Sequence, residues 1–284
     1  MTSTVRVRPR GPDRRALRST AIAFVSTIVV FGGIAYVVVN SPGWPDVRAS
    51  FFDGDIFWAS LPKLIAAFLL NVVMFVTAEI LVLIFGLVLA LMRSLPGPVF
   101  FPIRLIATIY ADVFRAVPGL LVVSLLGFGI PALGLVDPKT SPLIFGVFAL
   151  TLVYSAYVSE VYRAGIDSIH PSQSMAARSL GLSHIQTLRH VVVPQAVRRV
   201  IPPLLNDFIG LQKDTVLVSY IGVVEIFRQA QISQAANFNF TPYMGVALVF
   251  LVVTIPLARF TDWLIAHDKG MRDPGGNRGR GMFQ

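Results

Sequence analysis

The 284-residue chain contains no cysteine. Disulfide bonds, thiolate nucleophiles and thiolate metal sites are therefore excluded, although this absence does not identify the cellular compartment. Histidine is also scarce: the chain has four, and all of them lie outside the long apolar segments. Because no histidine falls within an apolar segment, a proton relay built on histidine inside a membrane is disfavoured.

Several enzyme motifs are missing as well. The sequence has no G-x-x-x-x-G-K-[ST] phosphate loop, no H-E-x-x-H and no G-x-S-x-G. These patterns would have indicated nucleotide binding, a zinc protease and a serine hydrolase, respectively. We therefore expect no enzyme active site on this chain, and no cofactor or metal bound by it.

Charged residues are few, and apolar residues dominate. Only 14% of the chain is charged and 55% is hydrophobic, whereas a soluble domain has about a quarter charged residues. A membrane-spanning helix needs about 20 apolar residues. Six segments meet or approach that length: 21–39, 64–92, 116–136, 140–159, 201–227 and 243–266. We predict an all-α integral membrane protein with about six transmembrane helices.

Basic residues are unevenly distributed between these segments. Arginine and lysine gather in the basic tail 1–20, between the second and third segments, between the fourth and fifth, and in the tail 267–284. The remaining loops hold only four cations, Arg48, Lys63, Lys139 and Arg228. This asymmetry follows the positive-inside rule and predicts a multi-pass plasma-membrane protein with both termini cytosolic. Topology explains the tails better than nucleic-acid binding, so no nucleic-acid partner is expected.

The first apolar segment is predicted to be a retained helix. It follows an arginine-rich stretch, as a signal peptide does, but it is longer than a typical signal core. The sequence at its end, Val37-Val38-Val39, also lacks the small residues of a cleavage site.

The cytosolic segment 168–196 is longer and more structured than an ordinary connection. Pro171 suits the first turn of a helix, and Gly181 suits the left-handed residue that ends one. Ser183 and Gln186 have the spacing of a capping box, which predicts a second helix there. Pro194 predicts that this helix ends near Val193.

Two interpretations of this helix–turn–helix remain open from the residues alone. Ile185, Leu188 and Val192 form an apolar stripe at helical spacing, beside a basic side. Such a segment can rest on lipid headgroups. It can equally dock into the groove of a partner protein.

Three short motifs in and after this segment occur together. The first is Ala176-Ala177 followed by Gly181 and Pro194, the second is Pro194-Gln195-Ala196, and the third is Lys213-Asp214-Thr215. A further match lies upstream, at Phe114, Arg115 and Pro118. Together they resemble the signature of bacterial ABC importer permeases, and more narrowly the polar-amino-acid uptake subfamily. The resemblance covers about Leu64 to Ala266. One position departs from it, because Met175 stands where that family usually has glutamate.

The resemblance implies a domain organisation and a set of partners. Residues 64–266 would form a five-helix permease domain, and 21–63 an added transmembrane helix with an external linker. Expected partners are an ATPase subunit that holds ATP and Mg²⁺, a second permease subunit, identical or homologous, and an extracytoplasmic binding protein. The expected solute is a polar amino acid similar to glutamate, glutamine or arginine. Coupling to the ATPase would involve Met175, Ala176, Ala177, Arg178, Gly181, Leu182, Ile185 and Pro194.

Some polar residues fall within predicted membrane spans. Glu79 lies near the centre of the second span, and Lys213 and Asp214 lie near the centre of the fifth. A charge at mid-bilayer costs about 2.5–3.5 kcal/mol on insertion scales, so these groups should face protein or water. They could line a translocation path together with Asn71 and Thr215. Alternatively, Glu79 and Lys213 could pair to fix the packing, which we favour, or Glu79 could be protonated against other helices.

Two further predictions concern helix ends. Glu160 and Arg163 are three residues apart, so they can pair on one helix face. Pro118 suits the start of the third span, after an interfacial segment. An ion-coupled secondary transporter and a non-transporting membrane scaffold remain as alternative functions.

Overall fold

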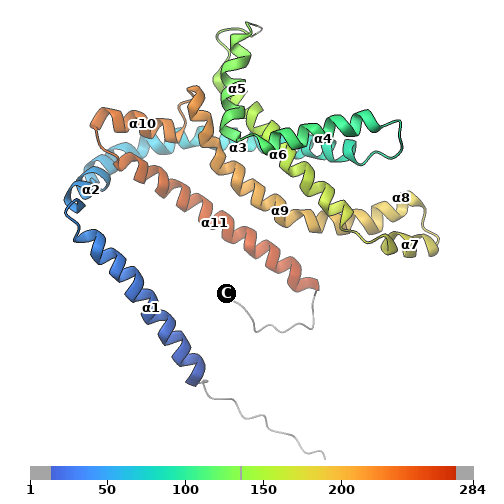
Figure 1. The fold of residues 1–284 in the computed structure, drawn as a ribbon, viewed down its shortest axis with the longest axis horizontal. Coiled ribbons are helices and arrows are strands. Elements are labelled where there is room, and N and C mark those ends of the chain that lie inside the picture. The colour runs from blue at the N-terminus through green and yellow to red at the C-terminus, as the bar shows by residue number, and fades with distance from the viewer. Residues whose placement is uncertain (1–13, 135, 273–284) are drawn as a thin grey trace, which may run out of the picture. The chain divides into compact units, whose positions relative to one another are not determined.

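A computed structural model describes residues 14–134 and 136–272, and this part of the chain contains helices and loops but no strand (Figure 1). The predicted all-α class is therefore confirmed. The predictions for basic residues before position 14 and for the tail after position 272 lie outside the described residues.

The chain divides into two compact units, Met1–Asp53 and Gly54–Gln284. The described part of the first unit consists of α1 (Arg14–Val39) and α2 (Trp44–Phe51). The portion of α1 from Ser19 to Val39 is long and apolar enough to cross a membrane. Every side chain in that portion is exposed within the unit, as expected for a helix whose neighbours are lipid or another chain.

The second unit is organised around α3 (Gly54–Arg93) and α6 (Pro142–Asp167), which pack along each other. Helix α3 thus begins ten residues before the predicted start of the domain at Leu64. Its buried residues recur every three or four positions, as the face of a helix does: Leu64, Phe68, Asn71, Met74, Ala78 and Val82. Helix α6 is buried over most of its circumference and lies at the centre of the unit.

The other helices surround this pair. They are α4 (Phe101–Ala116), α5 (Gly119–Ala132), α9 (Val193–Asp214), α10 (Ile226–Asn237) and α11 (Thr241–Arg272). Along α9, the short helices α7 (Pro171–Ser179) and α8 (His184–Thr187) lie beyond one end and α10 lies beyond the other (Figure 1). The loop segment and α10 therefore occupy opposite ends of the unit.

Glycines allow the central helices to approach closely. A Cβ atom added to Gly86 of α3 would lie 2.7 Å from Val158 Cγ1 of α6. Added Cβ atoms at Gly146 and Gly165 of α6 would overlap Val218 and Val200, respectively. Small residues at such crossings are characteristic of helices packed within a membrane, where close van der Waals contact drives association.

The third predicted span is bent. Val117 is extended, Pro118 caps the start of α5, and α4 and α5 meet at 106°. The predicted helix start after Pro118 is thus confirmed. Helix α5 has only 14 residues, or about 21 Å at 1.5 Å per residue, which is shorter than the predicted segment 116–136.

The described residues contain four helices that can cross a membrane, or five if the bent pair counts as one span. The predicted fifth segment, 201–227, is not a continuous helix. It is divided into α9, a 3₁₀ turn that we label η2 (Thr215–Ile221), an irregular stretch and the start of α10. Gly222 has φ +91°, a left-handed conformation that suits glycine and ends η2. The count of six spans is therefore not confirmed.

We predict that Gly146→Ala destabilises the protein by about 1–3 kcal/mol, the usual cost of overpacking a core. The added methyl group would overlap Val218, which is buried and β-branched and therefore has little room to move. Gly129→Ala on α5 is the matched control, because no heavy atom lies within 4 Å of its added Cβ. Thermal melting of both variants in detergent measures the difference, and equal melting temperatures would contradict the close packing.

Candidate functional site

The loop between α6 and α9 begins with a well-capped helix. His170 is the N-cap of α7, and its Nδ1 accepts a hydrogen bond from the Ser172 backbone N–H at 3.2 Å. At the other end Gly181 has φ +89°. The Gly181 N–H donates to the Arg178 carbonyl at 3.0 Å, and the Leu182 N–H donates to the Ala177 carbonyl at 3.3 Å. These two bonds make a Schellman motif, which confirms the prediction that Gly181 ends this helix in the left-handed conformation.

The second loop helix begins with the predicted capping box. Ser183 N–H donates to Gln186 Oε1 at 2.9 Å, and Gln186 N–H donates to Ser183 Oγ at 3.2 Å. Both groups are exposed, so the bonds fix the local direction of the chain more than they add stability. Helix α8 follows directly.

The predicted end of this helix near Val193 is wrong. After α8 the chain continues as a single π-helical turn, η1 (Leu188–Val192), and runs directly into α9. Pro194 lies in the first turn of α9, a position where its missing N–H needs no partner. The π-turn changes the hydrogen-bond register just before the proline, and such turns are frequent at functional sites.

The loop exposes three large apolar side chains among its polar ones. Met175, Leu180 and Ile185 are 60%, 82% and 75% exposed. A cavity of about 430 Å³ lies beside the loop helices, and its lining residues are Ile166, Ile169, Pro171, Ser174, Met175, Arg178, Thr187 and Val192. The Thr187 hydroxyl is buried there and has no partner among the described residues.

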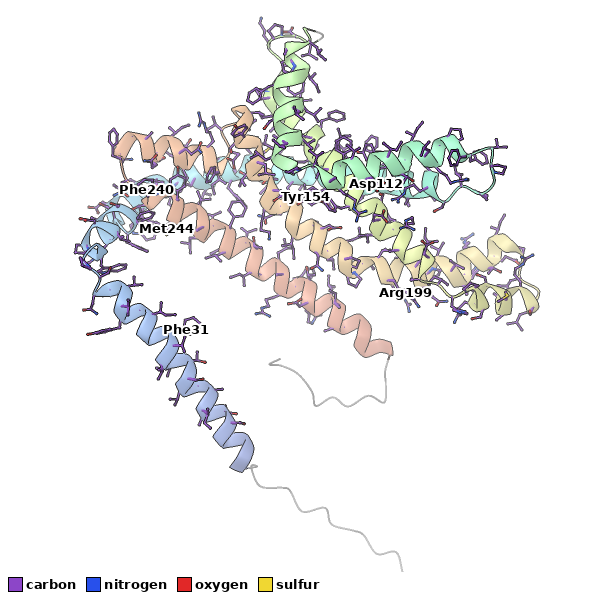
Figure 2. The ribbon with its side chains drawn as sticks, viewed as in Figure 1. Phe31, Asp112, Tyr154, Arg199, Phe240 and Met244 are labelled. Atoms are coloured by element: carbon purple, nitrogen blue, oxygen red, sulfur yellow. The ribbon has the colours of Figure 1, made fainter. Side chains whose placement is uncertain are left out.

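The eight predicted coupling residues therefore differ in their surroundings. Met175 and Arg178 share the cavity wall, and Ala176, Gly181, Ile185 and Pro194 are exposed. Leu182 is half-buried and Ala177 is buried. At the base of the loop, an Nη of Arg199 on α9 donates to the Ser168 carbonyl. Arg199, labelled in Figure 2, thereby fastens the end of α6 to α9.

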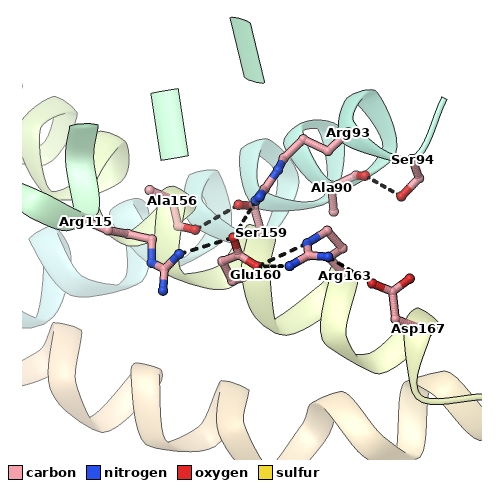
Figure 3. Close-up of polar contacts among 9 residues, drawn as sticks. All are labelled: Ala90, Arg93, Ser94, Arg115, Ala156, Ser159, Glu160, Arg163 and Asp167. Atoms are coloured by element: carbon pink, nitrogen blue, oxygen red, sulfur yellow. Dashed lines mark hydrogen bonds and ion pairs between the residues drawn. The ribbon is translucent and has the colours of Figure 1, made fainter. Parts of the chain in front are cut away.

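A group of arginines surrounds Glu160 near the same end of α6 (Figure 3). Arg93 Nη1 of α3 lies 2.8 Å from Glu160 Oε1, and Arg115 Nη1 of α4 lies 3.2 Å from the same oxygen. Arg163 Nη2 lies 3.0 Å from Glu160 Oε2, as predicted, and its Nη1 also reaches Asp167 Oδ2 at 3.0 Å. Only 10% of the Arg93 side chain is exposed, so removing Glu160 would leave a buried charge without its partner.

A buried polar group connects α3 to the break after α9. Asn71 Nδ2 donates to Thr215 Oγ1 at 3.0 Å and to Glu225 Oε2 at 2.9 Å. Asn71 Oδ1 accepts from the Ile226 N–H at 3.1 Å. Glu225 also caps α10, because it accepts from the Phe227 and Arg228 N–H groups. Asn71, Thr215 and Glu225 are at most 2% exposed, so they brace the helices.

The remaining predicted path residues are less buried. Asp214 Oδ2 accepts from the Tyr154 hydroxyl at 2.8 Å, and Tyr154 lies on α6 near the middle of the unit (Figure 2). Glu79 is half-buried and lies close enough to Asp207 of α9 for their charges to interact. Lys213 is exposed. Neither Glu79 nor Lys213 forms an ion pair among the described residues, so the structure lacks the Glu79–Lys213 pair that we favoured.

Three functional candidates were missed because each is one polar residue within an apolar run. Glu225, Asp207 and Tyr154 have no local pattern that predicts a partner. One physical argument could have indicated a role for Glu225, namely that burying a carboxylate without a hydrogen bond is costly. That cost implies a partner for Glu225 without naming Asn71, which lies 154 residues away.

A helical bundle with several apolar spans, braced by buried hydrogen bonds and carrying a structured loop, is typical of an integral membrane protein. Comparison with known proteins agrees: residues 82–267 match the family described as "Binding-protein-dependent transport system inner membrane component". The chain belongs to this family. It is therefore a membrane permease component of a transport system and not an enzyme.

Relatives in this family include amino-acid permeases. The chain is 34% identical over 204 residues to the "Probable amino-acid permease protein YxeN" of Bacillus subtilis, covering 72% of this chain and 90% of the relative. It is 33% identical over 221 residues to the "Glutamate/aspartate import permease protein GltK" of Escherichia coli O157:H7, covering 75% and 96%.

Solved structures share the fold. A chain from "an amino acid ABC transporter with histidines" superposes with a TM-score of 0.66 and 33% identity, over 72% of this chain and 94% of the other. A chain of the inward-facing MetNI methionine ABC transporter gives a TM-score of 0.55 at 16% identity, over 76% of this chain and 99% of the other. The second likeness concerns the fold alone.

We predict that Asn71→Ala lowers the stability of the protein strongly. The change leaves the Ile226 N–H without its acceptor, and a buried group without a partner costs about 1–3 kcal/mol. It also removes one bond each from Thr215 and Glu225, which keep other partners. Asn206→Ala on α9 is the matched control, since Asn206 is exposed. The melting temperature of Asn71→Ala in detergent should fall by several degrees relative to the control, and equal values would contradict the bracing role.

Proposed function

We propose that this chain is the membrane-spanning permease subunit of an ATP-driven importer for a polar amino acid. Membership of the family and the amino-acid relatives support this function. The observation that carries the coupling is the loop from 168 to 196, with its two capped helices and exposed apolar surface. The solute class comes from the names of the relatives, several of which concern glutamine or glutamate.

The loop is proposed to dock against a separate ATPase subunit that holds ATP and Mg²⁺. Met175, Leu180 and Ile185 offer an apolar contact surface, and Arg178 adds a charge at the cavity rim. With Met175 in place of an acidic residue, the contact depends on shape and on Arg178.

Movement of the loop is proposed to reach the bundle through two stiff connections. One is η1, which joins α8 to α9 without a break. The other is the bond from Arg199 to the Ser168 carbonyl, which joins α9 to α6. Closure of the ATPase on ATP would then shift α6 and α9 together and bias the permease between inward- and outward-facing packings.

The complete importer is proposed to contain two further proteins. A second permease subunit, identical or homologous, supplies the other half of the pathway, and an extracytoplasmic binding protein delivers the solute. In this arrangement, residues 64–266 form the permease domain and 21–63 an added helix with its linker. The tails 1–20 and 267–284 are cytosolic, in the plasma membrane of a bacterium.

The intramembrane polar residues are proposed to have different tasks in translocation. Glu79 has no cation partner among the described residues, and Lys213 has no anion partner, so both can meet the charged ends of a zwitterion. Asp214, which accepts a hydrogen bond from the Tyr154 hydroxyl, is proposed to line the same path. Asn71 and Thr215 hold the wall behind them.

We predict that Gly181→Val leaves the protein in the membrane but reduces ATP-driven uptake by tenfold or more. A β-branched residue is strained in the left-handed conformation, by roughly 1–2 kcal/mol, so α7 would move relative to α8. Gly181→Asn is the matched control, since asparagine tolerates this conformation. Uptake by the reconstituted complex in proteoliposomes is the measurement, and normal uptake by the valine variant would count against the docking role.

We predict that Glu79→Gln and Lys213→Met change the apparent KM or the selectivity for the solute while assembly stays normal. The reason is that each change removes one charge that has no ion-pair partner among the described residues. Asp262→Asn on α11 is the control, because it removes an exposed charge that already has a partner. Asp262 Oδ2 lies 3.7 Å from Arg259 Nη1. Competition between labelled L-glutamate and other amino acids measures selectivity. If both variants assemble and transport as the wild type does, neither residue forms the path.

A further inference from the structure

A second cavity lies at the end of α9 opposite the loop. It has a volume of about 540 Å³ and is formed by α5, η2 and the first turns of α10. Sites for small molecules commonly have about 300–1,000 Å³. Its walls combine the rings of Tyr220 and Phe227 and the side chain of Leu120 with three polar groups, Ser219, Arg228 and Gln231.

Arg228 carries the only charge on these walls, among the described residues. Its Nη1 donates to Gln231 Oε1 at 2.8 Å, which orients the guanidinium along α10. No ion pair involves Arg228 in the part of the chain that the structure describes. The other N–H groups of the guanidinium therefore remain available to a ligand.

Glu225, the carboxylate nearest to Arg228 in the sequence, bonds to other groups and not to the Arg228 guanidinium. Glu225 lies three residues before Arg228, but its Oε2 accepts from Asn71 and Phe227 N–H. Its Oε1 accepts from the Arg228 backbone N–H at 2.8 Å. The Glu225 carboxylate is thus buried in the bundle, whereas the Arg228 side chain is exposed at the cavity.

The position of this cation also runs against the charge distribution of the chain. Arg228 is one of only four cations in the loops opposite to the basic ones, where the positive-inside rule disfavours arginine. A planar guanidinium is suited to hold a carboxylate by two parallel hydrogen bonds. The described walls carry no acidic side chain, so they hold no carboxylate that could pair with a second ammonium or guanidinium group.

We propose that Arg228 in this cavity binds a carboxylate of the transported solute and selects anionic or neutral amino acids against cationic ones. This inference rests on the proposed import function and narrows its solute class. Ser219 and Gln231 supply further hydrogen-bonding groups, and Tyr220, Phe227 and Leu120 cover the carbon chain of the ligand.

The test uses the complex of this chain with its ATPase and second permease subunit, in nanodiscs of phosphatidylcholine and without the binding protein. Titration with L-glutamate and with L-arginine gives the two dissociation constants. Arg228→Gln should weaken L-glutamate binding about tenfold or more, since tenfold corresponds to about 1.4 kcal/mol and a charge-assisted bond contributes at least that much. Arg228→Lys should lose less, because it keeps the charge.

Lys139→Gln is the matched control, because it removes an exposed cation from another loop and should leave both constants unchanged. The preference for L-glutamate over L-arginine should fall in Arg228→Gln. An unchanged preference in a variant with normal melting temperature would overturn the proposal.

A second arm separates the solute from lipid, since a headgroup phosphate has similar chemistry. Two results together would show that the occupant is a lipid and that the proposal is wrong. The wild-type complex would fail to bind L-glutamate in phosphatidylcholine, and Arg228→Gln would only reduce the amount of phosphatidylglycerol retained from mixed bilayers. The import function has its own test, which is ATP-driven amino-acid uptake by wild-type complex with its binding protein. If the wild-type complex shows no ATP-driven uptake, the proposed function is wrong. If uptake is normal but Arg228→Gln binds L-glutamate as tightly as the wild type does, only this inference is wrong.

Discussion

The three-way hydrogen-bonded contact of Asn71, Thr215 and Glu225 is the constraint on which the second unit depends. All three side chains are buried, and buried polar groups in a helical membrane bundle must find partners within the protein. Because Asn71 is on α3, Thr215 opens η2 and Glu225 caps α10, one contact holds three elements. It fixes where the chain leaves α9 and, with that, where Asp214 and the cavity of Arg228 lie.

The opposite end of the bundle is held by charges instead of neutral hydrogen bonds. Glu160 accepts contacts from arginines of α3, α4 and α6 near the end of α6, and Arg199 joins α9 to the start of the loop. Exposed ion pairs are individually weak, but this cluster is partly buried and shared among three helices. The loop is thus attached to a stiff end of the bundle, as a segment that transmits movement requires.

Local chemistry made the loop largely predictable. Gly181, Ser183 and Gln186 act through partners within a few residues, so their spacing revealed both helix ends. Pro194 misled the prediction, because a π-turn places it in the first turn of a new helix. The pairing of Glu79 with Lys213 misled it too. Opposite charges in apolar segments suggested attraction, but Lys213 is exposed and no ion pair joins it to Glu79 among the described residues.

The sequence by itself determined the helical membrane class, the family and the loop's capped helices, because hydropathy, charge asymmetry and short-range hydrogen bonds are all written in neighbouring residues. Only the tertiary structure decided that the segment 201–227 is not one continuous helix, that Glu225 bonds to Asn71, and that Arg228 faces a cavity. Those outcomes depend on contacts between residues more than 150 positions apart, such as Asn71 and Glu225. No local pattern encodes such a pair, because many helix arrangements satisfy the same apolar periodicity.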